Sequence, residues 1–428
     1  MKLFKAHIIV VFVALFLAIG GCIEPFEAET LAFENALVID ARITDKLKRH
    51  EVILRRTYPF ENEDFEVERN ASVQISDDSG NTFDFQEAEA GKYVSVSEFA
   101  AQPNVGYRLL ITSADGKSYV SETVVTPRSV SIKDVKTEIA FNDFEKEGIS
   151  ISLTNNIVDS GGKYFRYEYE ETYKIIAPFY NPFEFDVIDS LFFADGDNDG
   201  FEIDIKPRDD DSQFCYGFQI GRDLILRDSE QNFNNSTGKF EIRFLENDDF
   251  KIAHRYSILV KQYNLSTDAY SYYSTLDDFA SDENVFTDIQ PGFLEGNITS
   301  LDENELVLGY FEVAAVNTKR IFFNYTDFYP DGPLPPYIIN CQLTTAPLLI
   351  SFVPHVGPGF VVDESDVVSP LLDGIQAGLI AYHEANEGYE EPEGDGEVEG
   401  IGPFFVKATG CIDCREFGSN IEPDFWIE

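Results

Sequence analysis

The sequence predicts a mainly β protein, with an N-terminal β-sandwich of the Ig-like or prealbumin-like kind and a larger β-rich domain that carries one amphipathic helix. Three observations indicate this. Short runs that alternate apolar and polar residues recur from residue 36 onward, with turn residues between them. Aromatic residues, which pack well on pleated surfaces, are frequent, with 38 Phe and 21 Tyr. One segment alone has a clear helical period.

The first predicted domain spans residues 36–127 and reads as strands and turns. Asp78 to Asn81 join two alternating runs, and Asp115-Gly116 joins two more, as in β-hairpins. Regular strands without a helix favour a small sandwich. The runs are ALVIDARI (36–43), HEVILRRTY (50–58), ASVQISDDSGNTFDF (71–85), GKYVS (91–95) and YRLLITSADGKSYVSETVV (107–125).

The second predicted domain, residues 128–428, continues the strand pattern. In KYFRYEYEETYKI (163–175), three aromatic residues fall on one face and charged residues on the other, which is typical of a half-buried strand. The aromatic face is Phe165, Tyr167 and Tyr169, and the charged face is Arg166, Glu168 and Glu170. Further strands are expected in 129–141, 148–156, 240–246, 254–263, 305–316 and 319–325, and the acidic segment 383–400 is expected to be an exposed loop.

The predicted helix covers residues 266–280. Ser266 suits the N-cap, and Asp268 suits the positive end of the helix dipole. One face is apolar and is expected to pack into the core. Its residues are Ala269, Tyr272, Tyr273, Leu276 and Phe279.

The first 21 residues are typical of an export signal. Lys2 and Lys5 precede an apolar run at residues 8–19, which is shorter than the roughly 20 residues that span a bilayer. Two glycines then precede Cys22, an order that resembles the lipobox of bacterial lipoproteins. We therefore expect diacylglycerol on Cys22 and an acidic tether over residues 22–35; the alternative is an ordinary signal peptide with a chance cysteine.

The formal net charge of the chain is −45. Such a charge repels nucleic acid and anionic lipid headgroups, so the sequence excludes nucleic acid as a partner. The same charge favours cations and solubility.

Four cysteines remain after Cys22, namely Cys215, Cys341, Cys411 and Cys414. An even number in an exported chain predicts two disulfides, for which three connectivities exist. We expect Cys341 to bond to one cysteine of the terminal pair. A four-thiolate zinc site and a redox role for the Cys-x-x-Cys pair are the alternatives.

The segment DGDNDGFEIDIK (195–206) is the candidate metal site, for calcium. Asp195, Asp197 and Asp199 occupy the first three ligand positions of an EF-hand-type loop, and Gly200 occupies the sharp turn. Lys206 stands where the loop normally has a bidentate glutamate. The alternative is an acidic turn between strands.

Two fragments look like catalytic motifs but lack required residues. DSGG (159–162) resembles a protease nucleophile loop, yet the mature chain upstream offers only His50 as a base, in a separate domain. HEANE (383–387) starts like a zincin helix but has Glu387 in place of the second histidine. The sequence therefore predicts no catalytic residues.

Several segments, taken in order, resemble one known family. They are the lipobox, LVIDARITD (37–45), QYNLSTDAYSYYSTL (262–276), GNITS (296–300), VLGYFEVAAVNTKRIFF (307–323) and CIDCREFGSNIEPDFW (411–426). Together they resemble an uncharacterised family of Bacteroidota outer-membrane lipoproteins, domain of unknown function 4249. The chain departs from it where relatives carry Gly-Gly-Thr after the second cysteine of the pair, because EFGSN (416–420) stands there.

The resemblance implies a lipid-anchored protein of the outer membrane, often encoded beside TonB-dependent transporters and without catalytic residues. Glu24, Glu27 and Glu29, just after Cys22, resemble the surface-export signal of Bacteroidota lipoproteins, so we expect the cell-surface face. We therefore expect a non-catalytic accessory or binding component of such a nutrient transporter. A glycosidase-like surface hydrolase and a structural or adhesive lipoprotein are the alternatives. Aromatic residues along a concave surface would favour binding, whereas two buried carboxylates about 5–10 Å apart in a cleft would favour hydrolysis.

Overall fold

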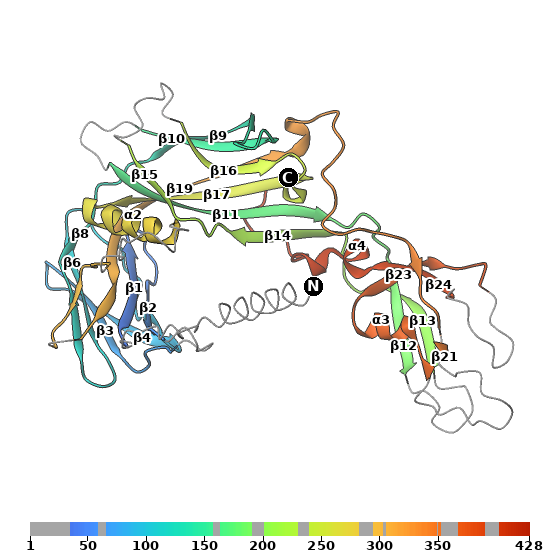
Figure 1. Ribbon diagram of the computed structural model, residues 1–428, viewed down its shortest axis with the longest axis horizontal. Coiled ribbons are helices and arrows are strands. Elements are labelled where there is room, and N and C mark those ends of the chain that lie inside the picture. Colours follow the sequence, from blue (N-terminus) through green and yellow to red (C-terminus); the bar gives the residue numbers. More distant parts are fainter. Residues whose placement is uncertain are drawn as a thin grey trace, which may run out of the picture.

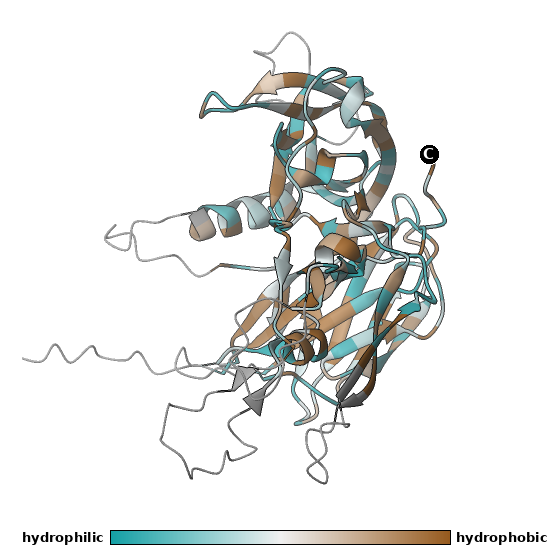
Figure 2. Ribbon diagram, turned by 90° about the vertical axis from the view of Figure 1, so that its right-hand side faces the viewer, coloured by the Kyte–Doolittle hydropathy of each residue, from teal (hydrophilic) through white to brown (hydrophobic). Residues whose placement is uncertain are grey.

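The computed structural model describes residues 35–58, 66–156, 163–190, 201–229, 239–281, 294–302, 305–348, 350–351, 367–389 and 402–428. Strands dominate these residues and helices are few, which confirms the mainly β prediction. Figure 1 shows an elongated molecule, with one sandwich at the N-terminal end, a second in the middle and a smaller lobe at the far end. Figure 2 shows apolar and polar residues alternating along the strands.

The first sandwich has the hairpins that the sequence predicts. Gly80, with φ +85°, and Gly116, with φ +92°, lie in two of its turns, in a backbone region that glycine adopts without steric cost. Alternate residues of β1 are buried, among them Leu37, Ile39 and Ile43. The strands are β1 (Leu37–Thr44), β2 (Glu51–Arg56), β3 (Ser72–Asp77), β4 (Thr82–Glu89), β5 (Lys92–Ser95), β6 (Gly106–Thr112), β7 (Ser118–Ser121) and β8 (Val124–Val125).

Two later strands complete the sheet of the first sandwich. β18 (Ile298–Ser300) pairs with β7, and the first half of β19 (Val307–Asn324) pairs in parallel with β1. The sheet curls around its core, so that the side chain of Asn297 bonds to both backbone groups of Phe311 in β19. Phe311 is fully buried in that core.

β19 is a single strand shared by both sandwiches. Residues 307–314 pair with β1, and residues 315–324 pair antiparallel with β17 (Arg255–Leu265). The sequence predicts two strands here, at 305–316 and 319–325. Asn317 and Thr318, between them, continue the pairing with β17, so the ladder overrides the local polar break.

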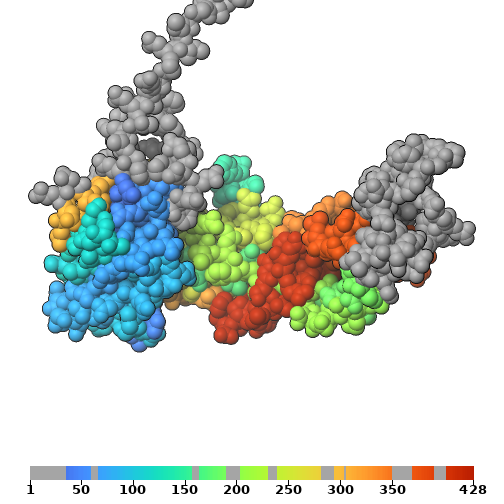
Figure 3. Space-filling model, turned by 90° about the horizontal axis from the view of Figure 1, so that it is seen from below, coloured from blue at the N-terminus to red at the C-terminus, as the bar shows by residue number. Residues whose placement is uncertain are grey.

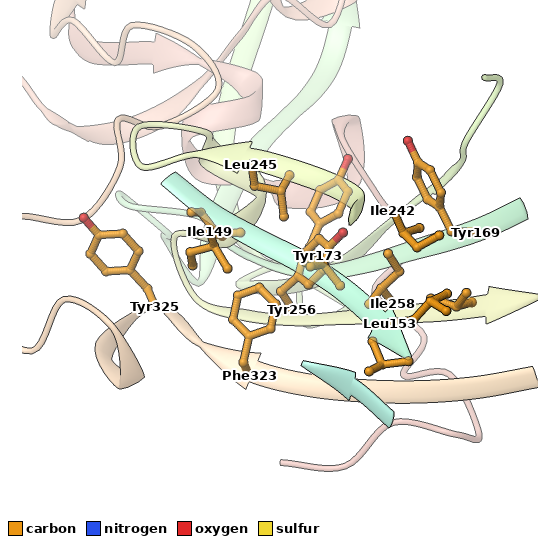
Figure 4. Close-up of a cluster of buried hydrophobic side chains, with 14 of the residues drawn as sticks. Ile149, Leu153, Tyr169, Tyr173, Ile242, Leu245, Tyr256, Ile258, Phe323 and Tyr325 are labelled. Atoms are coloured by element: carbon orange, nitrogen blue, oxygen red, sulfur yellow. The ribbon is translucent and has the colours of Figure 1, made fainter. Parts of the chain in front are cut away.

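The second sandwich packs a three-stranded sheet against the continuation of the long sheet. The small sheet is ordered β16-β10-β9, and the long sheet continues as β14-β11-β17-β19. Their core is rich in tyrosine and isoleucine, including Tyr169, Tyr173, Tyr256 and Ile258 (Figure 4). The new strands are β9 (Ile132–Phe141), β10 (Glu147–Asn155), β11 (Tyr164–Ile176), β14 (Phe214–Ile220), β15 (Ile225–Asp228) and β16 (Phe240–Glu246), with 3₁₀ turns η1 (Phe250–Ile252) and η2 (Tyr325–Asp327).

Helix α2 (Thr267–Ser281) confirms the predicted helix. The Oγ of Ser266 accepts a hydrogen bond from the backbone N–H of Ala269 at 3.1 Å, as expected of an N-cap. Ala269, Tyr272 and Tyr273 pack against β17 and β19. The expected apolar face is covered at its start only, because Leu276 and Phe279 farther along it are exposed.

The end lobe joins the β12–β13 hairpin to a small sheet ordered β20-β24-β23. The ring of Phe185 lies edge-on to those of Tyr382 and Phe404, at 5.6 and 5.3 Å, and holds the hairpin to this sheet. β23 takes in His383 to Ala385, the start of the segment expected to be a loop. The elements are β12 (Phe183–Ser190), β13 (Phe201–Pro207), β20 (Thr344–Thr345), β21 (Ile350–Ser351), β22 (Val367–Val368), β23 (Ile380–Ala385), β24 (Phe404–Ala408), α3 (Pro370–Gln376), α4 (Thr409–Ile412) and η4 (Cys414–Glu416).

Two disulfides tie the C-terminal part of the chain together, which confirms that prediction. Cys215 of β14 bonds to Cys414, and Cys341 bonds to Cys411. Cys341 is thus bonded to one cysteine of the terminal pair, as expected. Since the cysteines of the Cys-x-x-Cys pair take separate partners, the structure contains neither the four-thiolate zinc site nor a disulfide within the pair.

His50 is a buried titratable group in the first sandwich. Its Nε2 bonds to the carbonyl oxygen of Phe99 at 2.9 Å, and no other described residue bonds to its Nδ1. Burial lowers the pKa of His50 to about 4, although the Phe99 carbonyl opposes that change. The neutral ring therefore fits this environment better than the charged ring.

We expect His50 to make the free energy of unfolding depend on pH in the acidic range. The unfolded chain binds a proton near pH 6.5 and the folded chain only near pH 4, so stability is full above pH 6.5 and falls by roughly 3 kcal/mol as the pH drops through this window. Urea unfolding of wild type and His50→Gln across this range measures the difference, because glutamine can donate to Phe99 without titrating. Equal pH slopes in the two proteins would contradict the expectation.

Candidate functional site

Some of the sequence-predicted site residues fall outside the described residues. These are the lipidation residue Cys22 and the calcium candidates Asp195, Asp197 and Asp199. Within the described ranges, no group of three or more His, Cys, Asp or Glu side chains could hold a metal ion. Nor does any described helix have the length and apolar character needed to cross a membrane.

A polar cluster lies beneath α2, where the two sandwiches meet. Arg42 comes from β1, Arg166 and Glu168 from β11, and Glu312 from the shared strand β19. We call these four residues, together with Tyr263 of β17 and Tyr273 of α2, the junction network. It brings together five elements that span much of the described chain, from β1 to β19.

The two arginines of the junction network bridge its two glutamates. Arg166 donates to Glu312 Oε1 at 3.0 Å and to Glu168 Oε1 at 2.8 Å. Arg42 donates to Glu168 Oε1 at 3.0 Å, and its Nε lies 3.2 Å from Glu312 Oε1. Arg166 and Glu312 are buried, whereas the side chains of Arg42 and Glu168 are 27% and 31% exposed.

Tyrosines enclose these charges. The hydroxyl of Tyr263 donates to Glu168 Oε2 at 2.8 Å. The guanidinium carbons of Arg42 and Arg166 lie 5.1 and 4.6 Å from the centroid of the Tyr263 ring, and that of Arg166 lies 4.9 Å from the Tyr273 ring. Such cation–π contacts favour a charged guanidinium over an aromatic face.

The protonation states follow from these contacts. Burial would raise the pKa of Glu168, but Arg42 and Arg166 outweigh it and lower that pKa below its usual range. Burial and the neighbouring glutamate raise the pKa of Tyr263 well above its ordinary value. The cluster therefore holds an ionised Glu168 beside a neutral Tyr263 near pH 7.

A second buried carboxylate, within the second sandwich, is likewise paired with cationic side chains. Glu171 accepts from Arg243 Nε at 2.9 Å and from the Tyr256 hydroxyl at 2.6 Å, and Lys251 Nζ lies 3.5 Å away. The remaining buried carboxylates of the described chain also have cationic partners. Glu68 pairs with Arg56, and Asp413 with Arg208 and Arg415.

The sequence correctly predicts that Arg166 lies on the face opposite Phe165. The expectation that this charged face meets solvent is wrong for Arg166. The residue is 4% exposed, because Tyr273 of α2 and Glu312 of β19 contact its guanidinium. Glu312, the other buried half of the pair, was not singled out. Its signal is present in the sequence, because it is the one charged residue within the apolar run VLGYFEVAAV.

A family model matches residues 23–320 of the chain. Its description is "Domain of unknown function (DUF4249)". The matched stretch contains the residues of the junction network and ends within β19. No curated protein matches the chain.

Proposed function

The chain belongs to the DUF4249 family, and we propose that it acts as a non-catalytic binding component of a TonB-dependent nutrient transporter. Family membership confirms the resemblance to this domain of unknown function. The lipid on Cys22, the outer membrane and its cell-surface face belong to the proposal, and they rest on the lipobox and on what the resemblance implies.

The observation that carries the non-catalytic part is the pairing of every buried carboxylate in the described ranges with a cation. A glycosidase needs two carboxyl groups on either side of a sugar bond, one of them protonated through a raised pKa. Between Glu168 and Glu312 stand two guanidinium groups, and the pKa of Glu168 is lowered. This arrangement supports a rigid scaffold better than hydrolysis.

Lipidation supports the binding part of the proposal. Two or three acyl chains confine a protein to a membrane surface, which raises its effective concentration beside other membrane proteins. Modest affinity is then sufficient for a lasting complex. The rigid junction between the sandwiches would present one fixed surface to such a partner.

The test is affinity purification of the tagged full chain from mildly solubilised membranes of its native host. We expect wild type to recover an identified β-barrel transporter, and Cys22→Ala to lose membrane association or to accumulate as unprocessed precursor. Deletion of the gene should impair uptake of one nutrient class. Unchanged processing and partitioning of Cys22→Ala would refute the anchor. Recovery of no barrel, together with hydrolysis of a surface polysaccharide by the purified protein, would favour the hydrolase alternative.

A further inference from the structure

Strand β14 forms one edge of the long sheet of the described chain. In Figure 1 it runs along the lower side of the second sandwich, between the first sandwich and the end lobe. Figure 3, which views the molecule from that side, shows the yellow-green surface of this region between the blue first sandwich and the red C-terminal part.

In β14, the backbone N–H and C=O groups of every second residue point away from the sheet. The N–H of Ala177 bonds to Gln213 O and that of Gly221 to Tyr169 O, so odd-numbered residues of β14 form the hydrogen-bonded pairs with β11. Even-numbered residues must then direct their N–H and C=O outward. Tyr216 does so, because both of its backbone groups bond to Ser419.

The C-terminal segment of the same chain therefore already pairs with one position of this edge. Ser419 makes a single antiparallel bridge with Tyr216, and Gly418 lies so close that an added Cβ would be 2.6 Å from Tyr216 O. The remaining outward positions toward the C-terminal end of β14 are Phe218 and Ile220, whose side chains are 59% and 54% exposed.

Beyond the bridge at Tyr216, residues 217–221 lack the usual protection of an edge strand. Natural edges carry charged residues, proline or bulges that discourage pairing with another chain. The sequence FCYGFQIG contains no charge and no proline, and β14 pairs with β11 without a register shift. An open edge with exposed apolar side chains is a site for strand addition.

Charge limits what can occupy this edge. Exposed acids outnumber exposed cations in the loops before and after β14 and in the C-terminal segment. The acids include Asp209, Asp210, Asp211, Asp223, Glu422, Asp424 and Glu428, and the cations are Arg222 and Arg415. A second copy of the chain would bring another formal charge of −45 against these acids, which disfavours self-association. A basic segment would be attracted.

We propose that the edge of β14 at Phe218 and Ile220 takes an extended, basic segment of the partner as an additional strand. The inference rests on the proposed function, since it assigns that segment to the transporter. The backbone of the segment exchanges hydrogen bonds with Phe218 and Ile220. Its alternate apolar side chains pack on theirs, and its cations face the surrounding acids.

The test compares two proline variants. Phe218→Pro removes an outward N–H and should be tolerated by the fold, because proline is accepted at edge positions whose N–H faces solvent. Ile139→Pro is the matched control, on the edge strand β9 of the other sheet. Asn142 bonds to Lys146 O, so Ile139 also directs its N–H outward, and its side chain is 46% exposed.

We expect Phe218→Pro to reduce recovery of the barrel by about tenfold or more, and Ile139→Pro to leave it unchanged. Melting temperatures of both variants check the fold. If Phe218→Pro does not fold, the double variant Phe218→Lys/Ile220→Lys keeps the N–H groups and places like charge against a basic segment. A photocrosslinking amino acid at Phe218 should join the chain to a basic segment of the barrel, whereas one at Phe144, which is 85% exposed, should not.

The outcomes separate the two proposals. If wild type recovers the barrel and both proline variants recover it equally, the edge is not the contact and this inference is wrong, while the proposed function stands. A crosslink from Phe218 to a second copy of the chain would also overturn it. If wild type recovers no barrel, the proposed function fails, and the assignment of the segment fails with it.

Discussion

Replacement of Glu312 by alanine is expected to lower the free energy of unfolding by about 3–5 kcal/mol, because it leaves the buried Arg166 without its buried counter-ion. The loss should reach both sandwiches, since Glu312 lies on the strand that they share. Urea unfolding of the mature chain measures the change.

Glu168→Ala is the matched control for this prediction. Glu168 binds the same two arginines, but its side chain is 31% exposed, so water can reach the gap that its removal leaves, and the loss should be smaller than in Glu312→Ala. If Glu168→Ala lowers the free energy of unfolding as much as Glu312→Ala does, the burial of the carboxylate does not determine the size of the effect. A small loss in both variants would mean that water replaces the missing carboxylate.

Removal of the Cys215–Cys414 disulfide, as Cys215→Ser/Cys414→Ser, is expected to cost about 2–5 kcal/mol. The bond closes a sequence separation of 199 residues, so its loss returns much freedom to the unfolded chain. It also releases the C-terminal segment from β14. Guanidinium unfolding measures the loss.

The other disulfide provides the comparison. Cys341→Ser/Cys411→Ser opens a separation of 70 residues within the end lobe and should leave the contact between Ser419 and Tyr216 in place. Peptide mapping of unreduced wild type should find both pairs, Cys215–Cys414 and Cys341–Cys411. Four thiols available for labelling in the denatured, unreduced protein would contradict both predictions.

Local patterns predict the local elements of this fold well. The Asp-Gly turns, the faces of β11 and the capped helix α2 each depend on residues close in sequence. Ser369 and Pro370 give the same kind of signal for the short helix α3, where Ser369 caps Leu372, but this helix was not predicted.

Long-range features could not be predicted in the same way. Nothing near Asn317 shows that β19 continues through it, because the reason is a ladder with β17. The choice among disulfide pairings depends on which strand ends meet in space. Burial of Arg166 depends on α2, which is about a hundred residues later in the chain. The calcium candidates Asp195, Asp197 and Asp199 and the lipidation residue Cys22 lie outside the described residues, so they stay predictions.

The shared strand also determines how the molecule would carry mechanical load. A pull applied to the chain ahead of Leu37 acts along the axis of β1, away from the second sandwich, which holds the far end of β19. The eight paired positions between β1 and β19 are then loaded in shear, all at once, instead of being opened one after another. A tethered protein dragged at this end would therefore transmit force directly to its middle, with both sandwiches moving as one body.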